Sequence, residues 1–393
     1  MNLFLSHKVW FAAAALCLPV AGQTSKVESI ANPSAIGSLQ ASWSTARDGS
    51  PLLSWIETQK DESYTLKYAV RRGTQWSEPR TIAAHRQFFR QPAELPEVIS
   101  LSDGTLLAHW VESPSEGSEA EFSYVAASHD GLRWTAPVII HKDRSMVQHG
   151  LASIAASGDR EASILWLEAL QGEDGPVSLK RTVVNAEGKV VKEEALDSDV
   201  CACCPTSVVK TARGLLVAYR DRTTQDIRDI AVLRLENGRW SASKNVNPDK
   251  WKLNACPTNA AAAAAQGERV AIAWFTGAQN SPRDQIVFSS DAGATFTKPV
   301  VVSTGHSFGY TSIALDAQGN ALVSWLEQGG AAGARILIRQ VSPAGVAGPV
   351  IQVAEGSRRS LGYPRILQSG NETWIAWTSS ATAAKVQTAR LVK

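Results

Sequence analysis

Short apolar runs with an aromatic residue near the middle recur along the chain at a nearly constant spacing. The seven aromatic residues stand 51 to 56 positions apart and are Trp55, Trp110, Trp166, Tyr219, Trp274, Trp325 and Trp377. Most runs follow an alternating segment and a turn containing Gly or Asp, as in "SIALDAQGNALVSW". Alternation with a period of two, broken by turn residues and without helical periodicity, predicts short antiparallel strands. The sequence therefore predicts seven repeats built from strands.

Each repeat has room for four strands, because a third and often a fourth alternating segment follow the apolar run. Repeats of about 50 residues with four antiparallel strands are typical of β-propeller blades. We therefore expect an all-β fold, a single seven-bladed β-propeller over residues 23–393. The last repeat offers three strands, so the segment "SKVESIA" near the N-terminus is expected to supply the fourth strand and close the ring.

Residues 1–22 have the pattern of a secretory signal peptide. Lys8 is followed by the apolar run "VWFAAAALCLPV" and then by the small residues Ala21 and Gly22. Cys17 would leave with this segment, and the mature protein is expected in the periplasm or secreted, with the two left open. A formal net charge of +2 with mixed signs gives no footprint for nucleic acid. We expect no membrane insertion either, and a monomer.

Two predicted turns carry a recognisable motif. One is "SSDAGATF", with Ser289, Asp291, Gly293 and Phe296, and the other is the shorter "SHDGLRW", with Ser128, Asp130, Gly131 and Trp134. Both resemble the Asp-box of the sialidase-like (bacterial neuraminidase repeat) propellers. The resemblance implies a structural role for these residues, on the face away from the active site. It also gives an alternative fold, since the catalytic ring of that family has six blades.

In a propeller, the starts of the innermost strands and the ends of the second strands share one face, the mouth of the channel. The first set contains Arg90, His149, Cys203, Cys204, Cys256, Tyr310, Tyr363 and Arg365. The second set contains Glu57, Glu112, Glu168 and Glu327, each two residues after a blade tryptophan, and in the fourth repeat Arg220, Asp221 and Arg222. The four glutamates are interpreted as a solvated rim or as pairing partners of a neighbouring blade.

Four cysteines remain after the predicted signal peptide: Cys201, Cys203, Cys204 and Cys256. The segments "CCPT" and "ACPT" align between adjacent repeats, so Cys256 is expected to lie within disulfide distance of the cluster. The sequence cannot choose its partner among the three. The alternatives are free thiols, a thiol redox site, or copper(I) or zinc held by the cluster with His149 or His306. Apart from that alternative, no cofactor is expected.

The segment "YRDRTTQDIRDI" has the highest density of charge in the chain. Its guanidinium groups suit a carboxylate or phosphate ligand, although the charges can also neutralise one another. We expect a ligand such as an acidic glycan, or an exported protein, to bind at the mouth near repeats three to five. The residues of this site would be His149, Arg220, Asp221, Arg222, Arg228 and Trp251, with the tryptophan as a platform for a sugar.

An enzyme of sialidase type is the alternative function. The resemblance implies three arginines that hold the substrate carboxylate, a tyrosine nucleophile helped by a glutamate, and an acid/base aspartate. Positions that match are Arg90 in "FRQP", Arg222, Arg365, Tyr363 or Tyr310, and Glu168. No acid/base aspartate is in reach, because the one aspartate between Arg90 and the first Asp-box, Asp103, belongs to a turn on the opposite face. Glu94 or Glu97 could substitute only if its carboxyl lies at the right distance from the leaving group. The sequence therefore favours binding over glycoside hydrolysis.

Overall fold

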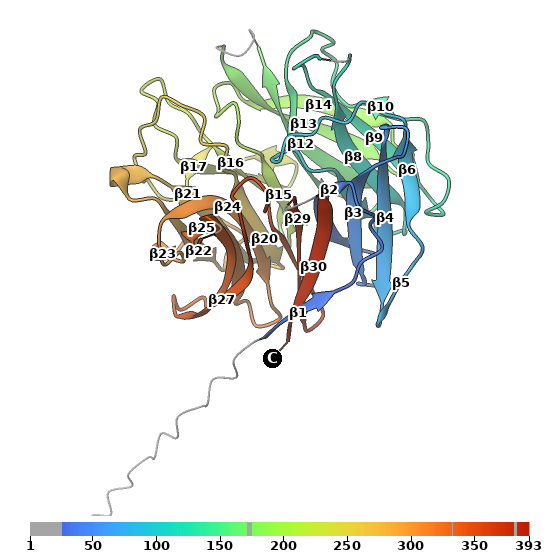
Figure 1. Ribbon diagram of the computed structural model, residues 1–393. Helices are drawn as coiled ribbons and strands as arrows, with labels where there is room; N and C mark the ends of the chain where they lie inside the picture. The colour runs from blue at the N-terminus through green and yellow to red at the C-terminus, as the bar shows by residue number, and fades with distance from the viewer. Residues whose placement is uncertain (1–25, 116, 171–174, 332, 381–382, 393) are drawn as a thin grey trace, which may run out of the picture.

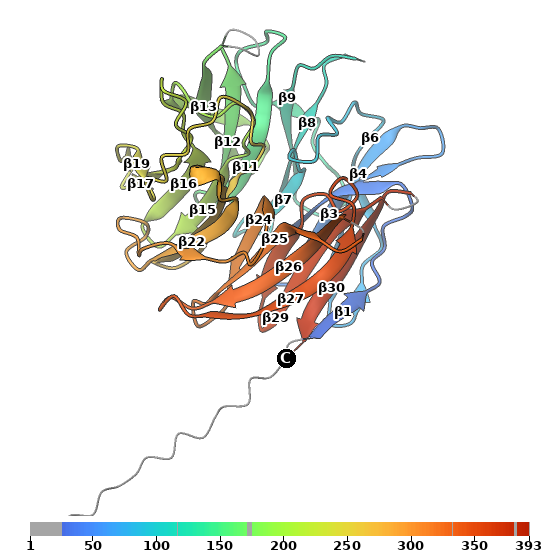
Figure 2. The same cartoon turned by 60° about the vertical axis from the view of Figure 1, so that its left-hand side comes forward.

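The computed structural model describes residues 26–115, 117–170, 175–331, 333–380 and 383–392. The predicted signal peptide lies outside these residues. Seven antiparallel sheets stand around a common axis, as Figures 1 and 2 show from two sides. The prediction of a seven-bladed propeller is confirmed, and the six-bladed alternative is wrong. The described part of the chain contains no helix long and apolar enough to cross a membrane.

The first three blades run from the inside of the ring outward. Blade 1 consists of β2 (Ser38–Thr45), β3 (Pro51–Thr58), β4 (Tyr64–Arg72), β5 (Gln75–Trp76) and β6 (Arg80–Ala84). Blade 2 consists of β7 (Glu97–Ser100), β8 (Leu106–Glu112), β9 (Phe122–Ser128) and β10 (Val138–Ile139). Blade 3 consists of β11 (His149–Ala156), β12 (Glu161–Ala169), β13 (Val177–Asn185) and β14 (Val190–Asp197).

The next three blades repeat this order. Blade 4 consists of β15 (Ser207–Thr211), β16 (Gly214–Arg220), β17 (Ile230–Glu236), β18 (Arg239–Trp240) and β19 (Lys244–Asn245). Blade 5 consists of β20 (Ala261–Gln266), β21 (Arg269–Thr276), the short 3-10 helix η1 (Ala278–Asn280), β22 (Arg283–Ser289) and β23 (Val300–Val301). Blade 6 consists of β24 (Ser307–Leu315), β25 (Ala321–Gly329), β26 (Gly333–Val341) and β27 (Ala347–Gly356).

Blade 7 joins the two ends of the chain. Its strands are β28 (Arg365–Ser369), β29 (Glu372–Ser379), β30 (Lys385–Val392) and, outermost, β1 (Lys26–Ile30). The N-terminal strand pairs antiparallel with β30, from Lys26 opposite Val392 to Ile30 opposite Thr388. The predicted closure of the ring is therefore confirmed. It covers the edge of β30, which would otherwise leave unpaired backbone groups at the seam.

The recurring aromatic residues form the core between neighbouring blades. Five of them, on the second strands of their blades, are fully buried: Trp55, Trp110, Trp166, Trp274 and Trp325. The core between blades 5 and 6 shows the pattern, because Trp325 packs there with Ile286 of one blade and Ile313 of the other. First strands contact the first strands of the adjacent blades and so line the axis.

The glutamate that follows each tryptophan by two residues has a structural role. In blade 1, Trp55 Nε1 donates to Glu57 at 3.0 Å, and Lys67 lies 2.5 Å from the same carboxylate. A strand places such residues on one face, so a buried indole N–H meets its acceptor within its own blade. Glu112 and Glu327 accept from Trp110 and Trp325 in the same way, whereas Glu168 pairs with Lys180 and Trp166 donates to Thr182. These partners lie within the glutamate's own blade or in the loop before it, not on a neighbouring sheet.

The two Asp-boxes form hairpin turns between third and fourth strands. Asp291 accepts from the Thr295 amide at 2.9 Å, the Thr295 hydroxyl at 2.6 Å and the Ser289 hydroxyl at 2.7 Å. Although burial opposes ionisation, these bonds hold the pKa of Asp291 at about 2. Gly293 has φ +84°, and a Cβ there would meet Leu216 of blade 4. The turn thus needs both the carboxylate and the glycine.

The aromatic residue of each Asp-box packs on the preceding blade. Phe296 lies against the core shared with Leu216, and Trp134 meets Tyr68 edge to face at 6.1 Å. In the shorter box, Asp130 accepts from the amides of Leu132 and Arg133 at 2.8 Å, and these bonds lower its pKa. The motif therefore joins neighbouring blades at the face opposite the mouth.

Replacing Asp291 by alanine should lower the free energy of unfolding by about 1–2 kcal/mol, because the turn loses three hydrogen bonds to one carboxylate. Thermal and urea denaturation measure the change. Asp159→Ala, in an exposed turn of the same face, is the matched control and should stay within about 0.5 kcal/mol of the wild type. A stability unchanged in Asp291→Ala would contradict the structural role.

Candidate functional site at the mouth of the channel

The inner strands bend at the mouth, where each begins. Residues at this level adopt the left-handed conformation, with φ between +50° and +56°: Gln40, Leu151, Thr258 and Tyr310. In β2, β11 and β24 the pairing register shifts at the same place. Such bulges re-aim side chains and are frequent beside functional sites. Here the bulges direct the backbone and side chains at the starts of the inner strands toward the channel axis.

Tyr363 closes the top of the channel. Its side chain enters from blade 7, and its hydroxyl donates to the carbonyl of Thr258 in front of blade 5. The ring of Tyr310 stands edge to face against it at 4.4 Å. Because Tyr363 is 8% exposed, burial raises its pKa well above the usual value. Its hydroxyl therefore stays protonated and donates its hydrogen to the Thr258 carbonyl.

Below Tyr363 lies a cavity of about 140 Å³ along the axis, which we call the channel cavity. Two charged side chains on its wall, Glu97 and Arg365, form an ion pair at 3.0 Å. Glu97 also accepts from the amide of Ile154 at 3.0 Å, and burial raises its pKa. Arg365 is thus neutralised inside the channel.

Above Tyr363 lies a second cavity of about 120 Å³, which we call the mouth cavity. Blade 1, the segment before blade 2, and blade 7 supply its walls. The lining includes Gln40, Arg90, Leu95, Arg359, Tyr363 and Thr378. Both arginines are exposed, and the described residues of this lining contain no carboxylate.

Three guanidinium groups line the mouth cavity or lie beside it, and none of them has a carboxylate partner among the described residues. Arg90 lies 4.4 Å above the ring of Tyr64 and donates to its hydroxyl at 2.7 Å. Arg358 lies 4.7 Å from the ring of Phe308 and donates to the hydroxyl of Tyr310 at 3.1 Å. Neither these two nor Arg359 comes within 4.0 Å of a carboxylate among the residues the structure describes. The mouth cavity is therefore basic.

The site expected near repeats three to five is organised differently. Arg220 is 2% exposed and donates to three backbone carbonyls: Asn259 at 3.1 Å, Arg228 at 2.8 Å and Phe275 at 2.8 Å. Trp251 lies under this guanidinium at 5.0 Å and packs against Phe275. Both side chains are buried and hold the loops of blades 4 and 5 together. In this structure both side chains make contacts within the protein, and the binding roles expected for them from the sequence stay a prediction.

The other charged residues of that region are also engaged. Arg228 is buried and donates to the carbonyl of Leu253 at 2.7 Å. Arg222 lies 3.2 Å from Asp226 and 3.9 Å from Asp199. Asp221 is half-buried, and burial raises its pKa to about 6. Arg222 is thus paired with carboxylates, whereas Arg220 and Arg228 are held mainly by backbone carbonyls.

His149 is fully buried at the start of β11. Its Nδ1 lies 3.1 Å from the carbonyls of Glu121 and Val147, and its ring stacks on His141 at 4.0 Å. Its Nε2 lies 3.6 Å from Asp143. These contacts place His149 inside the connection between blades 2 and 3, away from the mouth cavity.

The arginines matched to a sialidase do not come together. Arg90 rests on Tyr64, Arg222 pairs with aspartates of the blade 4 loop, and Arg365 pairs with Glu97 in the channel. Glu168 is 2.8 Å from Lys180, and the hydroxyl of Tyr363 is bonded to Thr258 rather than to a carboxylate. No tyrosine and glutamate pair is assembled among these residues.

Sequence reasoning missed part of this region. Arg358 and Arg359 are adjacent in "EGSRRSLGY", and their position just before the last inner strand was a usable signal. Glu94 and Glu121 form a buried carboxyl pair in which burial raises the pKa of Glu121 to about 8 and that of Glu94 well above its usual value. Nothing in the sequence around Glu94 or around Glu121 indicates that the two side chains lie next to each other.

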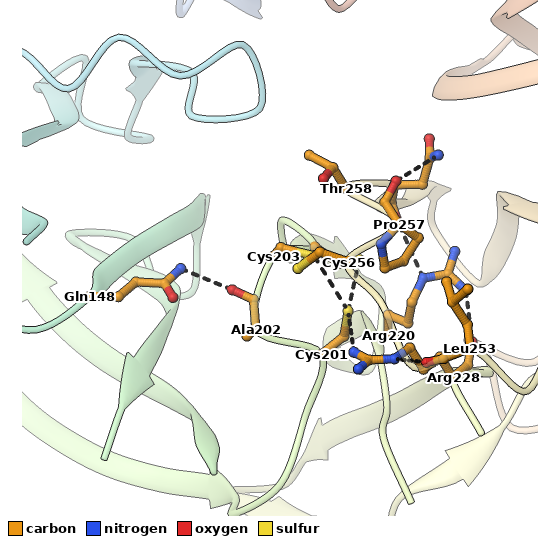
Figure 3. Close-up of a disulfide and its surroundings, with 12 residues drawn as sticks. Gln148, Cys201, Ala202, Cys203, Arg220, Arg228, Leu253, Cys256, Pro257 and Thr258 are labelled. Carbon is orange, nitrogen blue, oxygen red and sulfur yellow. Dashed lines mark hydrogen bonds between the residues drawn. A yellow bond between two sulfur atoms is a disulfide. The ribbon is translucent and has the colours of Figure 1, made fainter. Parts of the chain in front are cut away.

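The cysteines lie in the loops that lead into blades 4 and 5, and Figure 3 shows the disulfide that joins these loops. A disulfide joins Cys203 and Cys256, with the Cα atoms 5.9 Å apart. The predicted cross-link between Cys256 and the cluster is therefore present, and Cys203 is the partner. Cys201 and Cys204 are buried, with their Sγ atoms 3.0 Å apart.

Comparisons with known proteins agree with this architecture. The family described as BNR repeat-like domain matches residues 55–374. A search of curated proteins found no match. The BP39L lectin from Burkholderia pseudomallei is similar with a TM-score of 0.60 at 15% identity, over 90% of this chain and 96% of the lectin.

Two further solved structures resemble the chain. The polysaccharide lyase Uly1 has a TM-score of 0.55 at 10% identity, over 96% of this chain and 94% of the lyase. The GH93 α-L-arabinofuranosidase of Fusarium graminearum has a TM-score of 0.53 at 13% identity, over 94% of this chain and 98% of the enzyme. At these identities the likeness concerns the fold.

Proposed function

Because the chain belongs to the family of BNR repeat-like domains, we propose that it is an exported propeller that binds an acidic carbohydrate at the mouth cavity. This keeps the ligand class expected from the sequence. It moves the contacts from repeats three to five to the side formed by blades 7, 1 and 2.

The observation that carries the proposal is the group of three arginines that have no carboxylate partner in the described part of the chain. Arg90 and Arg359 line the cavity, and Arg358 lies beside it on Tyr310. Exposed guanidinium groups bind carboxylates through paired N–H donors, and the bonds are strongest when both partners are charged. A glycan carrying a uronic or sialic acid offers such a carboxylate.

Aromatic and polar groups around the arginines support a sugar as the carrier of that charge. Tyr363 forms the floor, and Gln40 and Thr378 add polar groups to the walls. Sugar rings pack on aromatic faces while their hydroxyls bond to polar side chains. The propellers of similar fold include a lectin, a polysaccharide lyase and an arabinofuranosidase, which favours a carbohydrate over other acidic ligands.

Binding is better supported than glycoside hydrolysis. Hydrolysis needs two groups in fixed positions on either side of the glycosidic bond. The described lining of the mouth cavity has no carboxyl group, and burial keeps Tyr363 protonated. We therefore propose binding, and the experiments described below also detect sialidase-type hydrolysis if it occurs.

Export is part of the proposal and is supported by two features. The Cys203–Cys256 disulfide is typical of oxidising compartments outside the cytosol. The pattern of residues 1–22 fits a secretory signal. Cleavage near Gly22, read from the N-terminal sequence of the purified protein, checks this part.

A glycan array with sialylated, uronic-acid and neutral glycans tests the function, followed by calorimetry with the best ligand. We expect binding to acidic glycans, weakened about 10- to 100-fold in Arg359→Ala and in Arg90→Ala, because each loses a charged hydrogen-bonding partner. Arg133→Ala, which removes one exposed arginine at the Asp-box face, is the matched control and should bind normally.

Two results would overturn this assignment. One is an affinity of Arg359→Ala and of Arg90→Ala for the ligand that equals the affinity of the wild type. The other is turnover of a fluorogenic sialoside that disappears in Arg90→Ala and Tyr363→Phe, which would establish the hydrolase instead.

A further inference from the structure

Three sulfur atoms gather in the loop between blades 3 and 4. Cys201 Sγ lies 3.0 Å from Cys204 Sγ and 4.0 Å from the disulfide-bonded Sγ of Cys203. Cys201 and Cys204 have the C-x-x-C spacing, and both are buried. Cys256, at the other end of the disulfide, is exposed. The cluster thus runs from a buried dithiol to a sulfur in contact with solvent.

Two buried arginines give Cys201 an unusual electrostatic environment. Arg228 Nη1 lies 3.3 Å from Cys201 Sγ. A dashed line in Figure 3 marks this contact. Arg220 lies within the same group of loops and forms no ion pair with a described carboxylate, and the nearest carboxylate to Arg228 is Asp226 at 3.9 Å. Buried cations need a compensating anion, and a thiolate at Cys201 supplies one.

The shifts in the pKa values of Cys201 and Cys204 agree with the position of the two arginines beside Cys201. The hydrogen bond between Cys201 and Cys204, together with the nearby Arg220 and Arg228, lowers the pKa of Cys201 to about 6, against the effect of burial. Burial raises the pKa of Cys204. One thiolate with a neighbouring thiol is the state in which a C-x-x-C pair is reactive.

We propose that Cys201 and Cys204 are a redox-active dithiol that exchanges with the Cys203–Cys256 disulfide and, through the exposed Cys256, with an external disulfide. This activity goes beyond glycan binding and does not depend on it. The buried pair would store two electrons that leave the protein only through the exposed pair.

The first half of the exchange takes place within the protein, and its atoms and electrons balance without an external oxidant or reductant. The Cys201 thiolate attacks Cys203 Sγ, the Cys203–Cys256 bond breaks, and the electron pair leaves on Cys256, which takes a proton from solvent. The thiolate of Cys204, after losing its proton, then attacks Cys201, and Cys203 leaves and takes up a proton. The result is a Cys201–Cys204 disulfide with Cys203 and Cys256 as thiols.

The second half transfers the electrons outward. The Cys256 thiolate attacks an external disulfide and releases one thiol. Cys203 then attacks Cys256 in the mixed disulfide and releases the second thiol. Overall, two protein thiols are oxidised to one disulfide while one external disulfide is reduced to two thiols.

The same arginines argue against a cation at this cluster. Copper(I) or zinc would add positive charge beside two buried guanidinium groups, and one of its three sulfur ligands, Cys203, is committed to a disulfide. A thiol redox site is therefore favoured over the metal site that the sequence left open.

Stepwise oxidation of the natively reduced protein by oxidised glutathione tests the proposal. Tryptic cleavage after Lys192 and Lys210 places Cys201, Cys203 and Cys204 on one peptide, and cleavage after Lys252 and Arg269 places Cys256 on another. Acid quenching, alkylation and mass spectrometry then distinguish a cross-link between the peptides from a disulfide within the first. We expect both disulfides to form in the folded protein.

Two double variants separate a relay from two independent pairs. In Cys203→Ser/Cys256→Ser, closure of Cys201–Cys204 should slow about tenfold or more, because the exposed pair is gone. In the matched Cys201→Ser/Cys204→Ser variant, Cys203–Cys256 should form at the wild-type rate. Circular dichroism and thermal denaturation verify that both variants are folded.

Three results would overturn the proposal. Cys201 and Cys204 could remain thiols after Cys203–Cys256 has formed, which makes them inert core residues. Cys203→Ser/Cys256→Ser could close its pair at the wild-type rate, which removes the relay. The reduced protein could hold stoichiometric copper or zinc that blocks oxidation until a chelator is added, which makes the cluster a metal site.

Discussion

Asp284→Asn is expected to raise the free energy of unfolding at pH 8 by on the order of 4 kcal/mol and to change it little at pH 4. Asp284 lies in β22 with no exposed surface, and accepts from the hydroxyls of Thr311, at 2.6 Å, and Ser307. Burial, helped by the charge of Glu327, raises its pKa to about 7, although the two hydroxyls oppose this. Asparagine has a similar shape and no charge to bury.

The sign of this effect follows from proton binding. Between pH 3.8 and about 7 the unfolded chain has released the proton of Asp284, whereas the folded protein keeps it. Unfolding therefore releases a proton, and each pH unit in this window lowers stability by about 1.4 kcal/mol for one such group. Above pH 7 the loss is complete and constant, and the neutral variant avoids it.

Urea denaturation of wild type and variant at pH 4, 6 and 8 measures the difference. The difference is the useful quantity, because His109, His141 and Cys201 also have shifted pKa values and change the absolute slopes. Asp316→Asn is the control, since this buried carboxylate accepts amide bonds in a turn and its loss should destabilise. Equal stability of Asp284→Asn and wild type at pH 8 would refute the prediction.

Arg220→Met should lower the free energy of unfolding by about 3–5 kcal/mol. The substitution keeps much of the side-chain volume but leaves the carbonyls of Asn259, Arg228 and Phe275 without their donor. Buried carbonyls without a partner are costly, and Trp251 loses the guanidinium that it packs against. The loops that connect blades 4 and 5 should therefore open at lower temperature or denaturant concentration.

Thermal and urea denaturation again provide the measurement, and glycan binding provides a second readout. Arg213→Met, at an exposed arginine of blade 4 paired with Glu268, is the matched control and should change stability by about 0.5 kcal/mol or less. A variant Arg220→Met that is as stable as the wild type but has lost its acidic ligand would restore the binding role expected from the sequence.

The architecture was predictable because its signal repeats. Seven copies of one pattern, with a tryptophan or tyrosine at nearly constant spacing, specify seven blades even though each copy is weak. The closing strand followed from counting, since the last repeat lacked one strand and the N-terminal segment had one to give. The cross-link followed from aligned Cys-Pro-Thr segments, although the choice of Cys203 depended on loop geometry that the alignment did not contain.

The orientation of single side chains was not predictable in the same way. Arg220 is the last residue of β16, and whether its guanidinium turns to the channel or between blades depends on carbonyls more than 30 positions away. Asp284 is the second residue of β22, and its partners come from the next blade. Long-range contacts of this kind decide whether a charged residue binds a ligand or holds the fold.

The pairing of β1 with β30 also determines how the propeller is oriented when it is attached to another molecule. Ser380, just before β30, lines the mouth cavity, and the strand then runs eight residues, or about 26 Å, to Val392 beside Lys26. Both ends of the folded ring therefore emerge from the side opposite the arginines. Any tether, carrier domain or surface anchor attached at either end would hold the propeller with its basic opening facing outward, free to meet large polymers.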